Sequence, residues 1–154
     1  MNKKNIKQET RIYTELNNLA FTQHPYWANR DVAEDLELFK PFRFLLDNEN
    51  LIIAEVHGKP VGFFLWYPDF NKMKSSQRDI NAFDVFKFRM GKYIDTFRFT
   101  EIGIAPEYQG SPVVLALISK ALPALIERGY KFAKVVLYLK KTELQLLCKA
   151  NTAT

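Results

Sequence analysis

A strand, a tight loop and a long apolar helix follow one another in the later part of the chain, and this succession constrains the fold most. Residues 98–104 predict the strand, and residues 105–110 predict the loop. Ser111 can cap the helix, Pro112 fits its first turn, where no amide donor is needed, and Gly129 stands at its end. The helix is more apolar than an exposed helix would be, so it packs against a sheet. Its apolar residues are Val113, Val114, Leu117, Ile118, Ala121, Leu122, Leu125 and Ile126.

The N-terminal part of the chain predicts two further helices. Apolar residues recur at three- and four-residue steps over residues 5–21, as on the buried face of an amphipathic helix. These residues are Ile6, Ile12, Leu16, Leu19 and Ala20. Asn29 can cap a second helix that places Val32, Leu36 and Phe39 on one face. Pro41 ends or kinks this helix, because its ring cannot continue the hydrogen-bond ladder.

A β-hairpin and a long connection lie between these two parts. Residues 51–56 and 60–67 are apolar, and residues 57–59 (His-Gly-Lys) supply turn chemistry. Residues 70–97 are rich in charge and form either an irregular excursion or a short helix, which we expect to serve as a lid or a partner surface.

The remaining elements complete a mixed α/β order. Pro123 lies inside the apolar helix, where a proline costs about 3 kcal/mol, so we expect a kink or an early break there. Residues 131–139 predict a last strand, and residues 142–149 predict a short terminal helix. Helices that alternate with strands in this way predict a sheet covered by helices.

Length and composition exclude several classes of protein. With 154 residues, of which 47% are hydrophobic, we expect residues 1–154 to form a single domain around one core. Cys148 is the single cysteine and His24 and His57 are the two histidines, so neither a disulfide framework nor a metal site is expected. The N-terminus carries no apolar signal region, and no apolar run approaches the roughly 20 residues of a membrane span. We therefore expect a cytoplasmic protein with no membrane partner.

The net charge of +5 favours phosphates, nucleic acid or acidic substrates, without choosing among them. Basic and aromatic residues mix over residues 83–98, but no ribonucleoprotein-type aromatic motif is present. We therefore expect no nucleic-acid partner.

Residues 100–110 read Thr-Glu-Ile-Gly-Ile-Ala-Pro-Glu-Tyr-Gln-Gly and precede the apolar helix. This segment resembles the coenzyme A site of the GNAT superfamily of acetyl-CoA-dependent N-acetyltransferases, and the hairpin resembles the second and third strands of that family. The likeness covers roughly residues 10–133. It implies a mixed, mostly antiparallel central sheet flanked by helices, with a V-shaped splay between the fourth and fifth strands.

The C-terminal segment departs from the family pattern, in which two further strands follow. Residues 134–148 admit a choice of codons that, read in a neighbouring frame, gives Lys-Gly-Gly-Phe-Ile-Phe-Glu-Glu-Asn-Arg-Ala-Ser-Ile-Ala-Leu. This string is much more similar to the family than residues 134–148 themselves. Our hypothesis is that a frameshift replaced the end of a longer acyltransferase, so that its last strands are missing. Sequencing the gene decides it.

The resemblance also implies an activity: transfer of an acetyl group from acetyl-CoA, the cosubstrate, to a small-molecule or peptide amine, with no metal. Attack of an amine on the thioester needs an uncharged amine, a base or water chain that removes its proton, and donors for the developing oxyanion. Glu101 lies where many family members place a carboxylate base. Alternatively, Glu101 is an ordinary strand carboxylate paired with Arg98 or a lysine.

The start of the apolar helix is the expected coenzyme A site. Unpaired N–H groups and a partial positive charge at a helix N-terminus can hold a pyrophosphate. By resemblance, the backbone of Ile102 and Ile104 binds the pantetheine arm. The expected phosphate-side residues are Gln109, Gly110, Ser111, Pro112, Val113 and Val114. Pro112 removes one amide donor and Val114 adds bulk where the family has small residues, so we expect both to affect cofactor affinity.

A function of another class remains open. The chain can be a non-catalytic GNAT-fold module that binds a protein partner, or forms a homodimer, through the sheet edge that the missing strands would cover. An unpaired sheet edge is an association site by default.

Overall fold

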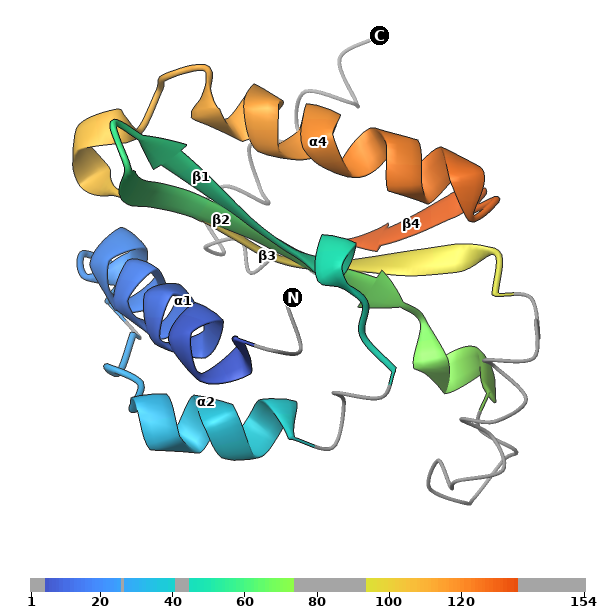
Figure 1. Cartoon of the computed structure of the whole chain (residues 1–154), viewed down its shortest axis with the longest axis horizontal. Helices are drawn as coiled ribbons and strands as arrows, with labels where there is room; N and C mark the ends of the chain where they lie inside the picture. Colours follow the sequence, from blue (N-terminus) through green and yellow to red (C-terminus); the bar gives the residue numbers. More distant parts are fainter. Residues whose placement is uncertain (1–4, 26, 41–44, 74–93, 136–154) are drawn as a thin grey trace, which may run out of the picture.

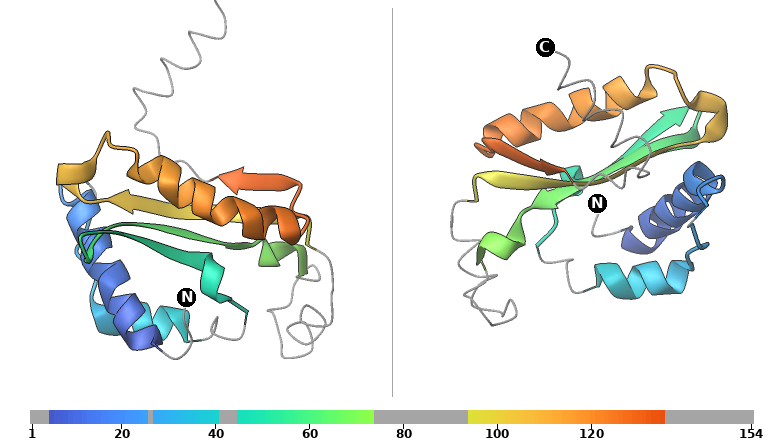
Figure 2. Two further views of the ribbon diagram at one scale, coloured as in Figure 1. Left: turned by 45° about the horizontal axis from the view of Figure 1, so that its top comes forward. Right: turned by 180° about the vertical axis from the view of Figure 1, so that it is seen from behind.

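The computed structural model describes residues 5–25, 27–40, 45–73 and 94–135, and in these residues helices cover both faces of one sheet (Figure 1). Helices α1 and α2 lie on one face, and α4 lies on the other, which the view from behind also shows (Figure 2). The predicted mixed α/β class, with a central sheet flanked by helices, is confirmed.

The sheet has the strand order β1-β2-β3-β4. Its strands are β1 (Leu51–Val56), β2 (Lys59–Pro68), β3 (Thr96–Ile104) and β4 (Phe132–Val135). The pairs β1–β2 and β2–β3 are antiparallel, and β3–β4 is parallel. The mostly antiparallel sheet is therefore confirmed.

The predicted hairpin forms between β1 and β2. Its two-residue loop consists of His57 and Gly58, whose φ angles are 50° and 75°. Two successive positive φ angles define the turn type whose twist matches that of the flanking strands. Lys59 was expected in the turn and is instead the first residue of β2.

The helix α1 (Ile6–Phe21) lies where the apolar spacing predicts it, but its buried face is more polar than expected. The face turned to the sheet carries Thr10, Tyr13, Thr14, Leu16 and Asn17. Leu19, expected in the core, is 43% exposed. The prediction counted apolar residues only and so missed the polar members of the buried face.

The helix α2 (Val32–Phe39) begins after Asp31, whose carboxylate accepts a hydrogen bond from the Ala33 amide at 2.7 Å. The expectation that Asn29 caps this helix is wrong, because Asp31 directly precedes the first helical residue. The segment between α1 and α2 is attached to α1 through Asn18. Its side chain donates to the Arg30 carbonyl at 2.9 Å and accepts from the Arg30 amide at 2.8 Å.

The helix α4 (Val113–Glu127) packs against the sheet as predicted. Pro112, directly before Val113, already has helical backbone angles, and the Ser111 hydroxyl accepts from the Val113 amide at 3.4 Å, in keeping with the expected cap. The helix also continues past Pro123, so the expected break does not occur there. At its end Gly129 has a φ of 68°, and the Tyr130 amide donates to the Leu125 carbonyl at 3.1 Å. This is the glycine-dependent helix ending that the sequence predicts.

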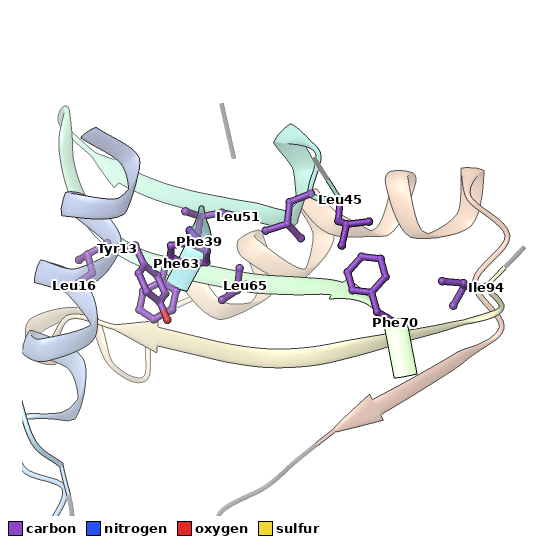
Figure 3. Close-up of a cluster of buried hydrophobic side chains, with 10 residues drawn as sticks. Tyr13, Leu16, Phe39, Leu45, Leu51, Phe63, Leu65, Phe70 and Ile94 are labelled. Atoms are coloured by element: carbon purple, nitrogen blue, oxygen red, sulfur yellow. The ribbon is translucent and has the colours of Figure 1, made fainter. Parts of the chain in front are cut away.

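Two apolar clusters fill the space between the sheet and its helices. The cluster on the α1 side is shown in Figure 3 and consists of Tyr13, Leu16, Phe39, Leu45, Leu46, Leu51, Phe63, Leu65, Phe70 and Ile94. The cluster on the α4 side consists of Phe64, Trp66, Ile104, Leu117, Ala121 and Leu125. Successive residues of β2 alternate between them, as the pleat of a strand requires.

Several predicted features lie wholly or partly outside the described residues. Of the charged connection over residues 70–97, the structure describes a short 3-10 helix at Phe70–Met73 and the start of β3. The last strand is described as Phe132–Val135. The predicted helix at residues 142–149, the Cys148 thiol and the segment beyond Val135, on which the frameshift hypothesis rests, lie outside them.

Candidate functional site

The strands β3 and β4 are paired over the whole described length of β4. The paired residues run from Thr96 with Phe132 to Phe99 with Val135. On its other side β3 pairs with β2, and the register shifts at Thr100: Leu65 pairs with Glu101, whereas Trp66 pairs with Phe99. An extra residue of this kind bends a strand and increases its twist. Val135 is the last described residue of the chain, so the splay that the resemblance implies between these two strands lies outside the described residues.

Beyond Thr100, Ile102 and Ile104 present backbone atoms on the side of β3 opposite to β2. The Ala105 amide donates to the Val61 carbonyl at 2.9 Å, so these two residues form a hydrogen-bonded pair. In an antiparallel ladder such pairs alternate with pairs whose backbone groups point outward. The pairing of Phe64 with Ile102 and of Gly62 with Ile104 is of the second kind. The polar backbone atoms of Ile102 and Ile104 thus point away from β2.

The loop after β3 leads to the N-terminus of α4. A 3-10 turn at Pro106–Tyr108 is followed by Gly110, whose φ of 77° is a left-handed conformation that side chains disfavour. A Cβ added at Gly110 would meet no heavy atom of the described chain within 4 Å. The backbone at this glycine is therefore accessible to a ligand.

Unbonded amides are concentrated at this helix start. The Ser111 hydroxyl donates to the Tyr108 carbonyl at 2.5 Å and accepts from the Val113 amide at 3.4 Å. Within the described part of the chain, the amides of Gly110, Val114 and Leu115 have no hydrogen-bond acceptor. No acidic side chain lies in the first turn of α4. These amides and the helix dipole together favour an anion.

The remaining expected phosphate-side residues have defined local positions. The Gln109 side chain donates to the Ile104 carbonyl at 3.2 Å and so links the loop to β3. Val114 packs, like Val113, against the apolar cluster on the α4 side. Pro112 supplies no amide donor and directly precedes Val113, the first residue of α4.

On the opposite face of the sheet, the Glu101 carboxylate is held by residues of α1. Its Oε2 atom accepts hydrogen bonds from the Tyr13 hydroxyl at 2.5 Å and from Asn17 Nδ2 at 2.8 Å. The Arg30 guanidinium approaches the same oxygen to 3.9 Å. The pairing with Arg98 or a lysine that the sequence suggested is wrong: Arg98 lies 3.9 Å from Asp69, and Arg30 supplies the cation for Glu101.

Arg30 links Glu101 to a second, more deeply buried carboxylate. Its guanidinium forms an ion pair with Asp35, whose side chain is 2% exposed, and Asp35 also accepts from the Thr14 hydroxyl at 2.7 Å. Burial opposes the charge of Arg30, but Tyr13, Asp35 and Glu101 outweigh it and raise the pKa of the guanidinium. Burial, followed by the charge of Glu101, raises the pKa of Tyr13 far above its usual range.

The sequence analysis missed Tyr13, Asn17 and Arg30 as partners of Glu101, and Asp35 as the partner of Arg30. A signal was present in α1, where Thr10, Tyr13 and Asn17 recur at three- and four-residue steps on one face. Polar residues at the spacing of a buried face indicate a polar network inside the protein. The partner strand could not be identified from that spacing alone.

Comparisons with known proteins show the fold. No protein-family model matches the chain, and no curated protein matches it. Solved structures do match: a GNAT family acetyltransferase from Brucella melitensis in complex with acetyl-CoA has a TM-score of 0.57 and 15% identity, and the match covers 90% of this chain and 75% of that one.

Two further structures are similar in the same way. An N-acetyltransferase from Staphylococcus aureus Mu50 has a TM-score of 0.56 at 15% identity, with 94% of this chain and 78% of that chain covered. An aminoglycoside acetyltransferase from an uncultured soil metagenomic sample, in complex with sisomicin, has a TM-score of 0.53 at 14% identity, with 96% and 82% covered. The chain therefore has the fold of the GNAT acetyltransferases, as its sequence predicted.

Two kinds of feature, a metal-binding group and a membrane-spanning helix, are absent from the described residues. No group of three or more His, Cys, Asp or Glu side chains that could hold a metal ion occurs among them. None of the described helices has the length and apolar character needed to cross a membrane.

Proposed function

We propose that the chain is an N-acetyltransferase that moves an acetyl group from acetyl-CoA to an amine. The observation that carries this proposal is the succession of outward-pointing backbone at Ile102 and Ile104, the open backbone at Gly110, and the unbonded amides of Val114 and Leu115. An extended, amide-rich arm can pair with the strand edge while its pyrophosphate lies at the helix start. Coenzyme A has this construction.

The expected cofactor residues fit this arrangement to different degrees. Gly110, Val113 and Val114 contribute through the backbone, since the two valine side chains pack against the sheet. Ser111 and Gln109 hold the loop in place through their side chains. Pro112 has no amide hydrogen to donate at the start of α4. We therefore expect the pyrophosphate to bind more weakly than it would at a helix start with a full set of amides.

In the proposed reaction, the amine nitrogen attacks the thioester carbonyl. The carbon–nitrogen bond forms, the carbon–sulfur bond breaks, the nitrogen loses a proton and the sulfur leaves as a thiolate that takes one up. Glu101 is the proposed proton acceptor, because it lies next to the outward-pointing backbone of Ile102 and its side chain is 21% exposed. The amine is a small molecule or a peptide; the soil acetyltransferase with sisomicin bound makes aminoglycosides the first acceptors to try.

A matched pair of glycine variants tests cofactor binding. Gly110 and Gly58 have φ angles of 77° and 75°, and an added Cβ meets nothing within 4 Å at either position. Gly110→Val and Gly58→Val therefore carry a similar backbone strain of about 1–2 kcal/mol. Acetyl-CoA should raise the Tm of the wild type and of Gly58→Val, but not of Gly110→Val. A shift that is absent from the wild type contradicts the proposal.

Acetyl transfer is then measured as thiol release with an aminoglycoside, a polyamine and a peptide with a free N-terminus. Release above the hydrolysis rate for at least one acceptor supports the proposal. Glu101→Gln should reduce this rate while leaving the acetyl-CoA thermal shift in place.

A second candidate function is supported by the outer surface of α4. Leu115 is 68% exposed and Ile126 is 74% exposed on a helix whose inner face is already buried. Apolar residues exposed together indicate a binding surface. In this case the chain is a non-catalytic module for a protein partner or a second copy. Acetyl-CoA would then leave the Tm unchanged, and sedimentation would show a complex.

A further inference from the structure

The hydrogen bonds to Glu101 are distributed unequally between its two oxygen atoms. Tyr13, Asn17 and Arg30 all approach Oε2. Oε1 has no hydrogen bond or ion pair within the described residues. One oxygen is therefore fixed by the protein, and the other retains its capacity to accept a proton or a hydrogen bond.

The donors that approach Oε2 are themselves held firmly. Tyr13 is 1% exposed and packs edge-on against Phe39 and Phe63, with ring centroids 5.3 and 4.9 Å away. Asn17 is fully buried on the same helix face. Because both come from α1 and the ring contacts of Tyr13 span α2 and β2, the position of Oε2 is determined by the core.

Arg30 is fixed at both of its ends. Its backbone is bonded to Asn18, and its guanidinium is paired with Asp35 and lies 5.6 Å from the centroid of the Tyr13 ring. The charge is therefore held near Glu101 by groups other than Glu101 itself. Glu101 therefore meets an arginine that is already ordered by Asn18 and Asp35.

We propose that Tyr13, Asn17 and Arg30 are positioning residues that fix Oε2 of Glu101 in a charged carboxylate and leave Oε1 to take the proton of the acceptor amine. This inference rests on the proposed acetyltransferase function. Among the described residues, the titratable groups that face Glu101 are Tyr13 from α1 and Arg30 from the segment before α2, with Asp35 of α2 behind the arginine.

The first test is Tyr13→Phe, which removes one donor and keeps the packed ring. The acidic limb of the kcat/KM profile should move up by about one pH unit, which corresponds to about 1.4 kcal/mol of lost stabilisation of the charged form. At fixed pH on that limb the rate should fall about tenfold, with the KM for acetyl-CoA unchanged. In a Glu101→Gln background, Tyr13→Phe should have no further effect on the profile.

Tyr130→Phe is the matched control, because it removes a half-buried tyrosine hydroxyl just beyond the C-terminal end of α4. It should leave the acidic limb where it is in the wild type. Asn17→Leu is the second variant, since it removes the other donor with little change of shape. If Tyr13→Phe and Asn17→Leu are folded and both keep the wild-type acidic limb, the proposal is overturned.

A readout that needs no activity separates this inference from the proposed function. The carboxyl carbon of Glu101 can be followed by NMR against pH and identified by its absence in Glu101→Gln. Its titration midpoint should be higher in Tyr13→Phe and Asn17→Leu than in the wild type. If the midpoint is higher in the variants and the wild type transfers no acetyl group, the positioning of Glu101 by Tyr13 and Asn17 is supported and the proposed acetyltransferase function is refuted. If the midpoint is unchanged, the positioning role is overturned, whether or not transfer occurs.

Discussion

The helix α4 buries only aliphatic side chains against its face of the sheet, whereas α1 and α2 bring hydroxyl, amide and charged groups into the interior of the other face. Leu117, Ala121 and Leu125 are the buried residues of α4. The buried residues of the other two helices include Thr10, Thr14, Asn17 and Asp35. Apolar packing holds α4 without a specific polar partner, so its N-terminal amides remain available. The polar face instead fixes one carboxylate of β3.

The largest effect is expected on the α4 side, at Trp66. This side chain is fully buried and makes edge contacts with Phe97 and Tyr130, at centroid distances of 6.0 and 5.9 Å. Trp66→Ala should lower the free energy of unfolding by about 4 kcal/mol, because it leaves a large cavity. Urea unfolding at low and high salt should give the same loss. Leu122→Ala, at a half-exposed position of α4, should cost less than about 0.5 kcal/mol.

The next largest effect is expected on the polar face, at Asp35. Asp35→Ala removes the partner of Arg30 and the acceptor of Thr14, and we expect a loss of about 3 kcal/mol in urea unfolding. The figure is at the low end for a buried pair, because the Arg30 side chain is 27% exposed. Glu37→Ala breaks an exposed pair with Lys40 on the same helix and should cost less than about 0.5 kcal/mol. If Asp35→Ala and Glu37→Ala lower the free energy of unfolding equally, the buried polar groups on the α1 and α2 face contribute no more than exposed ones do.

A pH-dependent effect separates the faces at high pH. The pKa of Tyr13 is raised by burial and then by the charge of Glu101, so its stabilising contribution is fully present below the unfolded value of about 10. As the pH rises above 10, the unfolded chain releases the tyrosine proton and the folded chain keeps it. The free energy of unfolding should then fall by about 1.4 kcal/mol per pH unit more steeply in the wild type than in Tyr13→Phe. If the free energies of unfolding of the two proteins fall in parallel between pH 10 and 11, the raised pKa of Tyr13 is contradicted.

The smallest effect is expected at Arg128, which connects the end of α4 to the residues before β1. Its guanidinium lies 2.9 Å from Asp47 and 3.1 Å from Glu49. Arg128→Leu should cost about 1 kcal/mol at low salt, because all three side chains are partly exposed. The loss should shrink at 1 M salt, where the screening length is about 3 Å. A salt-independent loss would mean that packing of the arginine stem, rather than its charge, attaches this end of α4.

Local signals in the sequence were sufficient for most of the fold. The hairpin follows from its turn residues, and the end of α4 follows from Gly129, because both depend on backbone angles that few residues adopt. Helix starts were less certain: Asn29 and Asp31 are both good caps, and only the folded chain shows that Asp31 caps α2. A proline inside a helix is unfavourable, yet α4 continues past Pro123, and residues on both sides of it pack in the apolar cluster on the α4 side.

The candidate site could be predicted in part, for a related reason. The helix start near Gly110 and the edge at Ile102 and Ile104 belong to one continuous stretch of sequence. The partners of Glu101 do not: Tyr13 is separated from it by 88 positions, and no local pattern links α1 to β3. Hydrogen bonds between distant segments depend on how helices dock, which a periodicity does not specify.

The attachment of Arg30 to Asn18 has a consequence for how this side of the molecule opens. Arg30 lies between α1 and α2, outside regular structure, where a backbone amide ordinarily exchanges with solvent within seconds or less. Its amide and carbonyl are both bonded to a side chain of α1, so exposing them requires α1 itself to detach. The Arg30 amide should therefore exchange with deuterium as slowly as the middle of α1. The two helices then form one cooperative unit that lifts from the sheet as a whole.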